Sequence, residues 1–511
     1  MGLSANAKYL LEQRYCKPGE TPEAVFKRTA ECLADKDMKL EERLYDLMTN
    51  GIFLPNSPAI YNSGATKPSL HACYCLPIED DIGSIFNTIS AMARIFKDGG
   101  GVGINFSNLR EKNAELSGGG SSSGTISFMT IFDNIVEVVK QGGYRRGALM
   151  GVLWYYHPEI FNFIKVKLEG KLQNFNLSIM VTDEFMQKVD DKENGVIDII
   201  SPKYGKIKEV RAKDIFDIMA FTSWVNGDPA LLFYNRINQD NPFYPDKPIV
   251  TTNPCSEVGL PPYGACCLGS INISKLVWKN TFNFDRFHDM CQVATRVLIN
   301  MNKISHYPLP AIKKEMEAHS PLGVGIMGFA DCLIKLGINY DSQECLDFID
   351  KIGKVYTEAT RSIDPETFHF YRRIIAPTGS LSILADCSSG IEPIYDVAFQ
   401  RNLVVGKIEE TRDLYKSQYC RTAYQVSPEW HVKVLAQWQK YADGGVSKTV
   451  NMPNNASVED IKEVYKLAWK MGVKGITVYR DGSREEQVLY SRPSTPPKVY
   501  MGKCSDGTCT L

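Results

Sequence analysis

The chain has 511 residues, of which 44% are hydrophobic and 23% are charged, the composition of an ordinary globular protein. Its 58 Lys and Arg residues almost balance its 59 Asp and Glu residues, and a net charge of −1 gives no electrostatic reason to expect binding to nucleic acid or to an anionic membrane. No apolar run approaches the roughly 18 residues of a membrane span, and residues 1–14 lack the basic start and apolar core of a secretion signal. We therefore expect a cytoplasmic protein.

The first part of the chain has the pattern of amphipathic helices. Thr21 and Pro22 form a typical N-cap and first helical residue, and Asn50 and Gly51 form a typical helix end. We predict a small helical N-terminal region, residues 1–52, that packs against the rest without taking part in chemistry.

From residue 53 onward, strand-like and helical patterns alternate, which favours an α/β architecture that extends to residue 484. The clearest strand-like segments are 71–77, 149–154, 196–200 and 231–234, and the clearest helical segments are 285–302 and 458–471. The glycine-rich run at 99–103 allows a close approach of backbone. It is not a dinucleotide-binding fingerprint, because Ile104 stands where that motif needs glycine.

Fourteen cysteines are many for a protein of a reducing compartment, where a cysteine is a buried thiol, a metal ligand or a redox catalyst. Six of them stand alone, and we interpret those as small hydrophobic residues: Cys16, Cys32, Cys291, Cys332, Cys345 and Cys420. The cysteines in patterned groups are Cys73 and Cys75, Cys255, Cys266 and Cys267, and Cys504 and Cys509. Cys504 and Cys509 fall in a tail, residues 485–511, whose Ser, Pro and Lys content predicts mobility. A cysteine pair there is poorly placed for packing and well placed to carry electrons.

The segment Asn253-Pro254-Cys255-Ser256-Glu257 holds an amide, a thiol and a carboxylate at every second position. On an extended segment these three side chains would share one face, whereas Pro254 favours the tip of a loop. Together they could hold a hydroxylated ligand, remove its proton and carry out sulfur chemistry on it. Taken alone, the segment is equally consistent with a turn that buries a structural thiol.

Two other segments have the residues of an anion site. Residues 376–382 place hydroxyl groups and backbone donors around Gly379, an arrangement that binds phosphate when it leads into a helix. Arg145 and Arg146 lie between glycines in the basic turn 141–147, which suits either an anionic ligand or a solvated surface turn.

Eight motifs in order along the chain resemble one family. They are LPNSP (54–58), ACYCLPIEDD (72–81), GGGVGINFSNLR (99–110), RRGALMGV (145–152), NPCSEV (253–258), CCLGSIN (266–272), APTGSLS (376–382) and GITVYRDGSR (475–484). This series is similar to the catalytic subunit of ribonucleotide reductases, most of all to the adenosylcobalamin-dependent class II, and the resemblance covers nearly all of the chain from about residue 5. It implies reduction of ribonucleotides, by closest resemblance the diphosphates, to 2′-deoxyribonucleotides.

The resemblance implies a ten-stranded α/β barrel over residues 53–484 with a central finger loop. Cys255 would be the thiyl-radical cysteine at the tip of that loop, with Asn253 and Glu257 as its amide and carboxylate partners. Cys73 and Cys266 would be the pair of thiols that reduces the substrate. Cys75 and Cys267 are additional cysteines to which the resemblance gives no role.

The other site residues are also implied by the resemblance alone. The positions that would hold the substrate are Ser57, Ala72, Gly101, Asn253, Pro254, Ser256, Pro377, Thr378, Gly379, Ser380 and Leu381. The positions that would bind a dNTP specificity effector or relay its identity are Asp80, Arg110, Arg145 and Arg146. Cys504 and Cys509 would be the shuttle pair that thioredoxin or glutaredoxin reduces, and the protein would be a homodimer without a metal ligated by its own residues.

Two departures from the family pattern favour adenosylcobalamin as the source of the radical. Class I members carry adjacent tyrosines where this chain has Val478-Tyr479, and the chain ends in a cysteine tail rather than a glycyl-radical motif. One alternative is a class I large subunit that needs a separate radical-generating subunit. Another is a non-catalytic nucleotide-binding protein with structural zinc on Cys73, Cys75, Cys266 and Cys267, whose spacings differ from the usual zinc knuckles.

Overall fold

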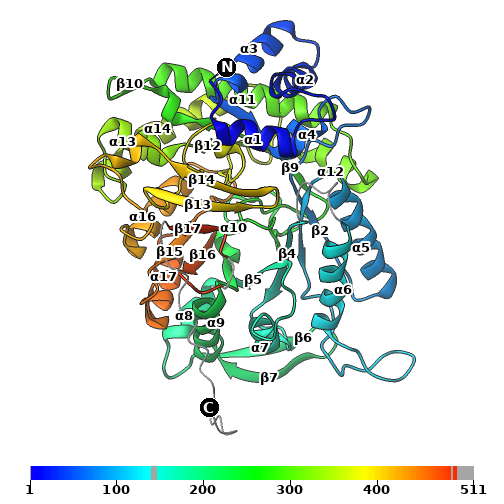
Figure 1. Ribbon diagram of the computed structural model, residues 1–511. Helices are drawn as coiled ribbons and strands as arrows, with labels where there is room; N and C mark the ends of the chain where they lie inside the picture. Colours follow the sequence, from blue (N-terminus) through cyan, green and yellow to red (C-terminus); the bar gives the residue numbers. More distant parts are fainter. Residues whose placement is uncertain (1, 140–146, 485–486, 492–511) are drawn as a thin grey trace.

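The computed structural model describes residues 2–139, 147–484 and 487–491. At one end of the molecule, α1 (Ala5–Arg14), α2 (Pro22–Ala34) and α3 (Met38–Thr49) pack together (Figure 1). The Thr21 side chain accepts a hydrogen bond from the backbone N–H of Ala24, which confirms the predicted N-cap. Gly51, just after α3, has a φ of +62°, in the left-handed region that glycine adopts without strain.

The centre of the molecule is a barrel of ten strand segments arranged in two parallel halves. The first half is the series β2 (Cys73–Leu76), β3 (Gly101–Asn105), β4 (Leu149–Trp154), β5 (Phe175–Val181) and β8 (Ala230–Phe233). The second half is the series β9 (Ala265–Asn272), β12 (Leu322–Met327), residues 373–375, β15 (Thr449–Met452) and β16 (Gly475–Arg480). Each half pairs in parallel throughout, as crossover connections through helices require.

The two halves join through antiparallel pairs, and this closes the ring. β2 pairs with β9 on one side and β8 pairs with β16 on the other. The short segment 373–375 completes the second half through single bridges from Arg373 to Val324 and from Ile375 to Val446. β1 (Phe53–Pro55) adds a further antiparallel pair to β9. The predicted ten-stranded α/β barrel is therefore confirmed.

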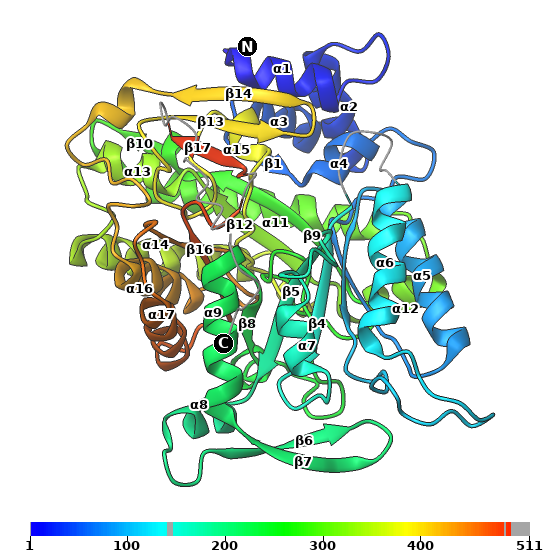
Figure 2. The same ribbon diagram turned by 60° about the horizontal axis from the view of Figure 1, so that its bottom comes forward.

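Helices cover the outside of the barrel, and α5 and α6 lie side by side on one flank (Figures 1 and 2). The longer helices are α5 (Ile82–Lys97), α6 (Thr125–Val138), α9 (Ala212–Asn226), α11 (Phe284–Ile304), α14 (Gln343–Arg361), α16 (Pro428–Gln439) and α17 (Val458–Lys470). The shorter ones are α4 (Ser57–Asn62), α7 (Ile160–Lys165), α8 (Asp183–Asp190), α10 (Tyr234–Asn238), α12 (Pro310–His319), α13 (Phe329–Leu336), α15 (Leu381–Leu384) and the 3₁₀ turns Ile273–Leu276 and Asp413–Lys416. No helix within the described ranges is long and apolar enough to cross a membrane.

Within the part of the chain that the structure describes, three small sheets lie outside the barrel. β6 (Val196–Ser201) and β7 (Gly205–Arg211) form a hairpin, so the strand predicted at 196–200 exists but does not belong to the barrel. β10 (Val277–Trp278) pairs with β11 (Thr281–Phe282). The third sheet has the order β14 (Gly406–Thr411), β13 (Ala398–Leu403) and β17 (Leu489–Ser491). β17 belongs to residues 487–491, the described part of the segment 485–511 that we expected to be a mobile tail.

The segment between α10 and β9 forms the predicted finger loop, and it runs through the inside of the barrel. Its two arms pair with each other through a bridge between Thr252 and Gly259. The arms are held from the barrel wall, because Asn105 Nδ2 of β3 donates to Val250 O at 2.6 Å and Tyr371 Oη donates to Gly259 O at 2.9 Å. The loop thus enters at the end of the barrel where β2, β3 and β8 finish.

At Gly103 of β3 the loop lies closely against the barrel wall. A Cβ atom added there would lie 1.7 Å from the backbone oxygen of Thr252, so a larger residue forces the loop or the strand to move. We predict that Gly103→Ala lowers the free energy of unfolding by about 1–3 kcal/mol, as overpacking of a filled interior does, and displaces the loop.

The measurement is chemical denaturation of both proteins. Gly118→Ala is the matched control, because a Cβ at residue 118 meets nothing within 4 Å. Equal stability of the Gly103→Ala and Gly118→Ala proteins would show that the loop does not pass so close to β3.

Candidate active site

The tip of the finger loop is a tight turn. Ser256 N donates to Asn253 O at 3.0 Å, and Ser256 adopts a left-handed φ of +68°. Asn253 and Glu257 are buried, whereas Cys255 is exposed. The loop tip predicted from Pro254 is therefore present, and the turn leaves Cys255 exposed between two buried residues, Asn253 and Glu257.

Asn253 is held by hydrogen bonds within the loop. Its Oδ1 accepts from Val258 N at 2.9 Å, and its backbone N–H donates to Val258 O at 2.9 Å. Its remaining donor group, Nδ2, lies 3.1 Å from Cys73 Sγ. The amide is thus fixed by the loop itself and oriented toward a thiol of the barrel wall.

Cys73 and Cys266 face each other across neighbouring strands. They are direct partners in the antiparallel pair of β2 with β9, and residues so placed have Cβ atoms about 4.5–5.5 Å apart. That spacing is within a small adjustment of disulfide geometry. The structure therefore brings together residues 73 and 266, which are far apart in the sequence, beside the loop tip.

Burial determines the protonation of both thiols. It raises the pKa of Cys73 well above its usual value, and the nearby Glu257, Cys255 and Cys266 raise it further. Burial likewise raises the pKa of Cys266, and the neighbouring Cys267 raises it further. Both groups are consequently neutral thiols at physiological pH and can donate a proton or a hydrogen atom.

The two additional cysteines lie on different sides of β2 and β9. Cys75 belongs to the apolar cluster inside the barrel, together with Cys73 and Cys266, and burial raises its pKa to about 12. Cys267 packs in the outer core, where its thiol donates to Asn302 Oδ1 at 3.1 Å. The four cysteines thus do not converge on one point, which argues against the structural-zinc alternative.

Glu257 is held through its backbone by a segment that the sequence did not reveal as part of the site. Its carbonyl oxygen accepts from Gly445 N at 2.7 Å, and a Cβ on Gly445 would lie 2.9 Å from Glu257 Cα. On the other side of the tip, Asn176 Nδ2 of β5 donates to Pro254 O at 2.7 Å. Asn176 and Gly445 therefore fix the tip from opposite halves of the barrel.

The loop at 377–381 follows strand segment 373–375, which we call the closing strand segment, and leads into α15, as expected for an anion site. Thr378 has a left-handed φ of +55°, and its Oγ1 accepts from Gly390 N at 2.7 Å. Gly379 at the top of the loop is exposed. Leu381, in contrast, is buried as the first residue of α15.

Two N-terminal residues that the sequence did not indicate contact predicted substrate positions, Arg14 at this loop and Tyr15 at Ser57. Arg14 donates through Nη1 to Ser380 Oγ at 2.6 Å, and the neighbouring Tyr15 hydroxyl lies 2.8 Å from Ser57 Oγ. The end of α1 thus ties the start of α4 to the start of α15. The N-terminal helices, which we expected to be free of chemistry, help to shape the site.

Ala72 and Gly101 complete the surroundings of the loop tip. Gly101 N donates to Ala72 O at 2.7 Å, and a Cβ on Gly101 would lie 3.2 Å from Pro254 Cγ. A side chain at residue 101 would therefore crowd the finger loop. Ala72, Gly101 and Pro254 are thus direct neighbours.

A cavity of about 330 Å³ adjoins the 377–381 loop and is lined by Pro377, Gly379, Glu392 and Leu489, among others. This volume lies at the lower end of the range for small-molecule pockets. Glu392 is held on its far side by the buried Lys448, whose Nζ lies 2.6 Å from Glu392 Oε2. Glu392 and Lys448 were not among the predicted site residues, because neither has a local motif around it that signals the pairing.

The predicted effector residues are partly described. Asp80 and Arg110 form an ion pair with each other, and Arg110 N also donates to Asp80 Oδ1 at 3.3 Å. Asp80 and Arg110 follow the C-terminal ends of β2 and β3, and Asp80 lies just before α5. Arg145 and Arg146, like Cys504 and Cys509, lie outside the described residues.

Comparison with known proteins agrees with this architecture. The family model for the ribonucleotide reductase all-alpha domain matches residues 1–68, and the model for the ribonucleotide reductase barrel domain matches residues 71–363 and 408–479. The chain belongs to the ribonucleotide reductase family. The matched barrel residues include the finger loop with Cys255 and the strands that carry Cys73 and Cys266.

Some relatives are named as vitamin B12-dependent reductases, and another is named as the large chain of a reductase. A vitamin B12-dependent ribonucleoside-diphosphate reductase of Mycobacterium tuberculosis is 35% identical over 98% of this chain and 82% of the relative. A protein of the same name from Thermoplasma acidophilum is 39% identical over 88% of this chain and 66% of the relative. A ribonucleoside-diphosphate reductase large chain of Schizosaccharomyces pombe is only 23% identical over 91% of this chain and 66% of the relative.

Proposed function

We propose that the chain is an adenosylcobalamin-dependent ribonucleoside-diphosphate reductase that forms 2′-deoxyribonucleotides for DNA synthesis. The observation that supports this most strongly is the exposed Cys255 thiol at the loop tip, next to the facing thiols Cys73 and Cys266. The names of the relatives at 35% and 39% identity support the same reaction and the same cofactor.

The residues present fit a radical source outside the polypeptide. Cys255 is exposed while its neighbours Asn253 and Glu257 are buried, so the thiol is open to a group bound against the outer side of the tip, at Cys255 and Ser256. Val478 is buried at the first position of the class I tyrosine pair, and Tyr479 follows it alone. When bound, adenosylcobalamin supplies the organic radical that removes the hydrogen atom from Cys255.

Cys255, Glu257 and Asn253 would activate the ribose. The Cys255 thiyl radical abstracts the 3′-hydrogen, Glu257 removes the proton of the 3′-hydroxyl as a general base, and Asn253 donates a hydrogen bond to that oxygen. The hydrogen bond from Gly445 N to Glu257 O would hold the backbone that carries this carboxylate. The substrate phosphates would bind at the 377–381 loop, with Ser57, Ala72, Gly101, Pro254 and Ser256 around the ribose.

Cys73 and Cys266 would supply the reducing equivalents. As protonated thiols, either of them can protonate the 2′-hydroxyl so that it leaves as water. The pair then gives two electrons and its second proton and forms a disulfide, for which its position on neighbouring strands is suited. Glu257 returns the proton of the 3′-hydroxyl, and Cys255 returns the hydrogen atom to C3′, which regenerates the thiyl radical. The raised pKa values of Cys73 and Cys266 keep their protons available up to at least the usual pKa of a thiol.

The remaining assignments belong to the same proposal. We assign residues 1–52 to a helical region, 53–484 to the catalytic barrel and 485–511 to a redox tail. Asp80, Arg110, Arg145 and Arg146 would bind or relay a dNTP effector, and the chain would form a homodimer through this effector site. A cytoplasmic location fits the twelve described cysteines, all of which are free thiols.

The reaction is tested by an anaerobic assay that contains CDP or CTP, adenosylcobalamin, dithiothreitol and a panel of dNTPs. We predict formation of the deoxynucleotide by the chain alone, with CDP preferred to CTP. Turnover that appears only after addition of a metal-containing second subunit would instead establish the class I alternative.

Replacement of Glu257 tests its role as the base. We predict that Glu257→Gln lowers kcat by about 10²- to 10⁴-fold, the usual contribution of a general base, with little change in KM, because the amide keeps the shape of the carboxylate. Steady-state kinetics with CDP measure both constants. A kcat equal to that of the wild type would exclude Glu257 as the base.

Replacement of Cys504 tests the proposed shuttle. We predict that Cys504→Ser retains turnover driven by dithiothreitol, which reaches the Cys73–Cys266 disulfide directly, and loses turnover driven by thioredoxin, which needs the tail for thiol–disulfide exchange. Cys420→Ser is the matched control, since Cys420 is a buried cysteine far from the tail in sequence. Normal thioredoxin-driven rates in the Cys504→Ser protein would refute the shuttle.

A further inference from the structure

A second and larger cavity lies at the end of the barrel opposite the 377–381 loop. Its volume is about 940 Å³, within the range of small-molecule sites. Arg372 and Arg373 stand at the start of the closing strand segment and line this cavity, whereas the 377–381 loop follows the end of the same segment. The cavity, which we call the basic pocket, is therefore separate from the site described above.

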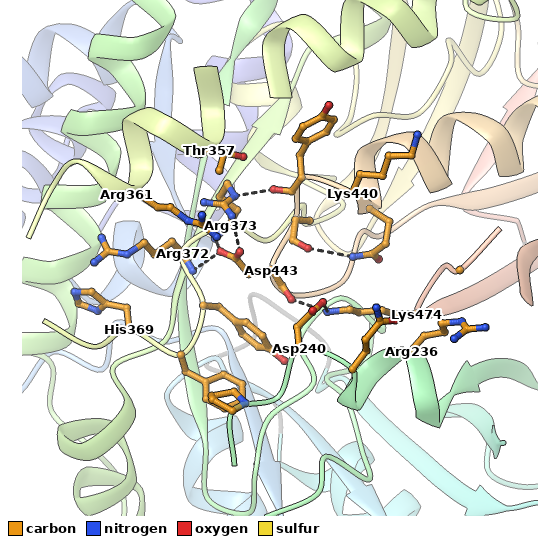
Figure 3. Close-up of a pocket in the computed structure, with 18 of the residues that line it drawn as sticks. Arg236, Asp240, Thr357, Arg361, His369, Arg372, Arg373, Lys440, Asp443 and Lys474 are labelled. Atoms are coloured by element: carbon orange, nitrogen blue, oxygen red, sulfur yellow. Dashed lines mark hydrogen bonds and ion pairs between the residues drawn. The ribbon is translucent and has the colours of Figure 1, made fainter. Parts of the chain in front are cut away.

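The basic pocket has a strong excess of positive charge. Seven of its lining residues are Lys or Arg and three are Asp or Glu, although the whole chain has a net charge of −1. Figure 3 shows Arg361 and Arg372 on one side of Asp443, with Lys474 and Arg236 on the other. Such a concentration of one sign of charge in a concave surface attracts anions.

Three cations at the floor of the pocket, Arg372, Arg373 and Lys474, already interact with other groups of the protein. Arg373 pairs with Asp443, and Arg372 donates to several backbone carbonyls, among them Thr360 O at 3.0 Å. Lys474 Nζ donates to Asp443 O at 2.6 Å. These groups build the floor of the pocket and would not by themselves call for a ligand.

Two other cations that line the pocket, Lys354 and Arg361, lie on one helix and are exposed. Lys354 and Arg361 lie seven residues apart on α14, which is two turns on the same face. Both are exposed lining residues, and neither side chain has a hydrogen bond or ion pair with another residue of the described ranges. They present two uncommitted charges to one side of the same cavity, at a spacing of roughly 10 Å along the helix.

An aromatic ring borders the same cavity. Phe368 is 48% exposed, an unusual state for phenylalanine, and it lines the pocket. Its ring is supported from behind by Phe243, with centroids 5.7 Å apart in an edge-to-face arrangement. An exposed, supported ring beside free cations is the combination that holds a nucleobase by stacking and its phosphates by charge.

We propose that the basic pocket binds a nucleoside triphosphate, with the phosphates at Lys354 and Arg361 and the base on Phe368. The C-terminal tail is not a suitable occupant, because residues 492–511 contain Arg492, Lys498 and Lys503 against Asp506 alone and are themselves basic. This site is distinct from the 377–381 loop and from Asp80 and Arg110, and it does not depend on the proposed reaction.

The floor of the pocket is in direct contact with the finger loop. Asp443 accepts from Lys474 at its backbone oxygen, and two residues later Gly445 N donates to Glu257 O at 2.7 Å. Gly444 N also donates to Arg373 O at 3.1 Å. A ligand in the basic pocket would therefore stabilise residues 443–445, the segment that holds Glu257.

Hydrogen–deuterium exchange of the full chain with ATP, without substrate or cofactor, tests the proposal at the pocket itself. We expect ATP to slow exchange in peptides that cover residues 443–446. We expect that effect to disappear in Lys354→Glu/Arg361→Glu, whose ATP affinity at this site should fall by about tenfold or more because both contacts become repulsive. Lys351→Glu is the control: it reverses an exposed charge on the same helix outside the pocket, and the protection should remain.

Calorimetry with inorganic tripolyphosphate tests the base contact. We expect ATP to bind the pocket more tightly than tripolyphosphate, and Phe368→Ala to remove that difference. Absence of ATP protection at 443–446 in the wild type, or equal protection in Lys354→Glu/Arg361→Glu, would overturn the site. Equal binding of ATP and tripolyphosphate in the wild type would overturn the assignment to a nucleoside.

Discussion

The passage of backbone through the inside of a closed barrel is the constraint on which the site depends. The loop between α10 and β9 fits only because Gly103 and Gly101 leave room for Thr252 and Pro254. Once inside, its tip is fixed by Asn176 from one parallel half and by Gly445 from the other. A tip supported from both halves holds its side chains in one geometry, which is what preorganised chemistry requires.

The three thiols of the site differ in their burial. Cys73 and Cys266 lie inside the barrel, where burial raises both pKa values and keeps the protons in place. Cys255 is exposed at the tip, where a hydrogen atom can leave toward an outside radical. The same barrel thus provides one accessible sulfur and two protected ones within a short distance. Asn253, which bonds its own loop and also faces Cys73, connects the two environments.

Local features of the fold could be predicted from the sequence, and long-range ones could not. The N-cap at Thr21 is set by a contact between residues three positions apart, and it is present. The closing strand segment at 373–375 is held by isolated bridges, which leave no periodic pattern to detect. The contact of Arg14 with Ser380 joins residues 366 positions apart, and the facing of Cys73 and Cys266 was accessible only through resemblance to a family. The strand at 196–200 was assigned correctly, yet its place outside the barrel depends on pairing with β7.

The central claim is that the sulfur of Cys255 passes a hydrogen atom between the cofactor and the substrate. It is tested most directly by following tritium from the 5′ position of labelled adenosylcobalamin into water, with the protein and a dNTP but without substrate. The wild type should release tritium, because the thiol hydrogen of an exposed cysteine exchanges with solvent. Cys255→Ala should bind the cofactor and release none, whereas release at the wild-type rate from Cys255→Ala would contradict the claim.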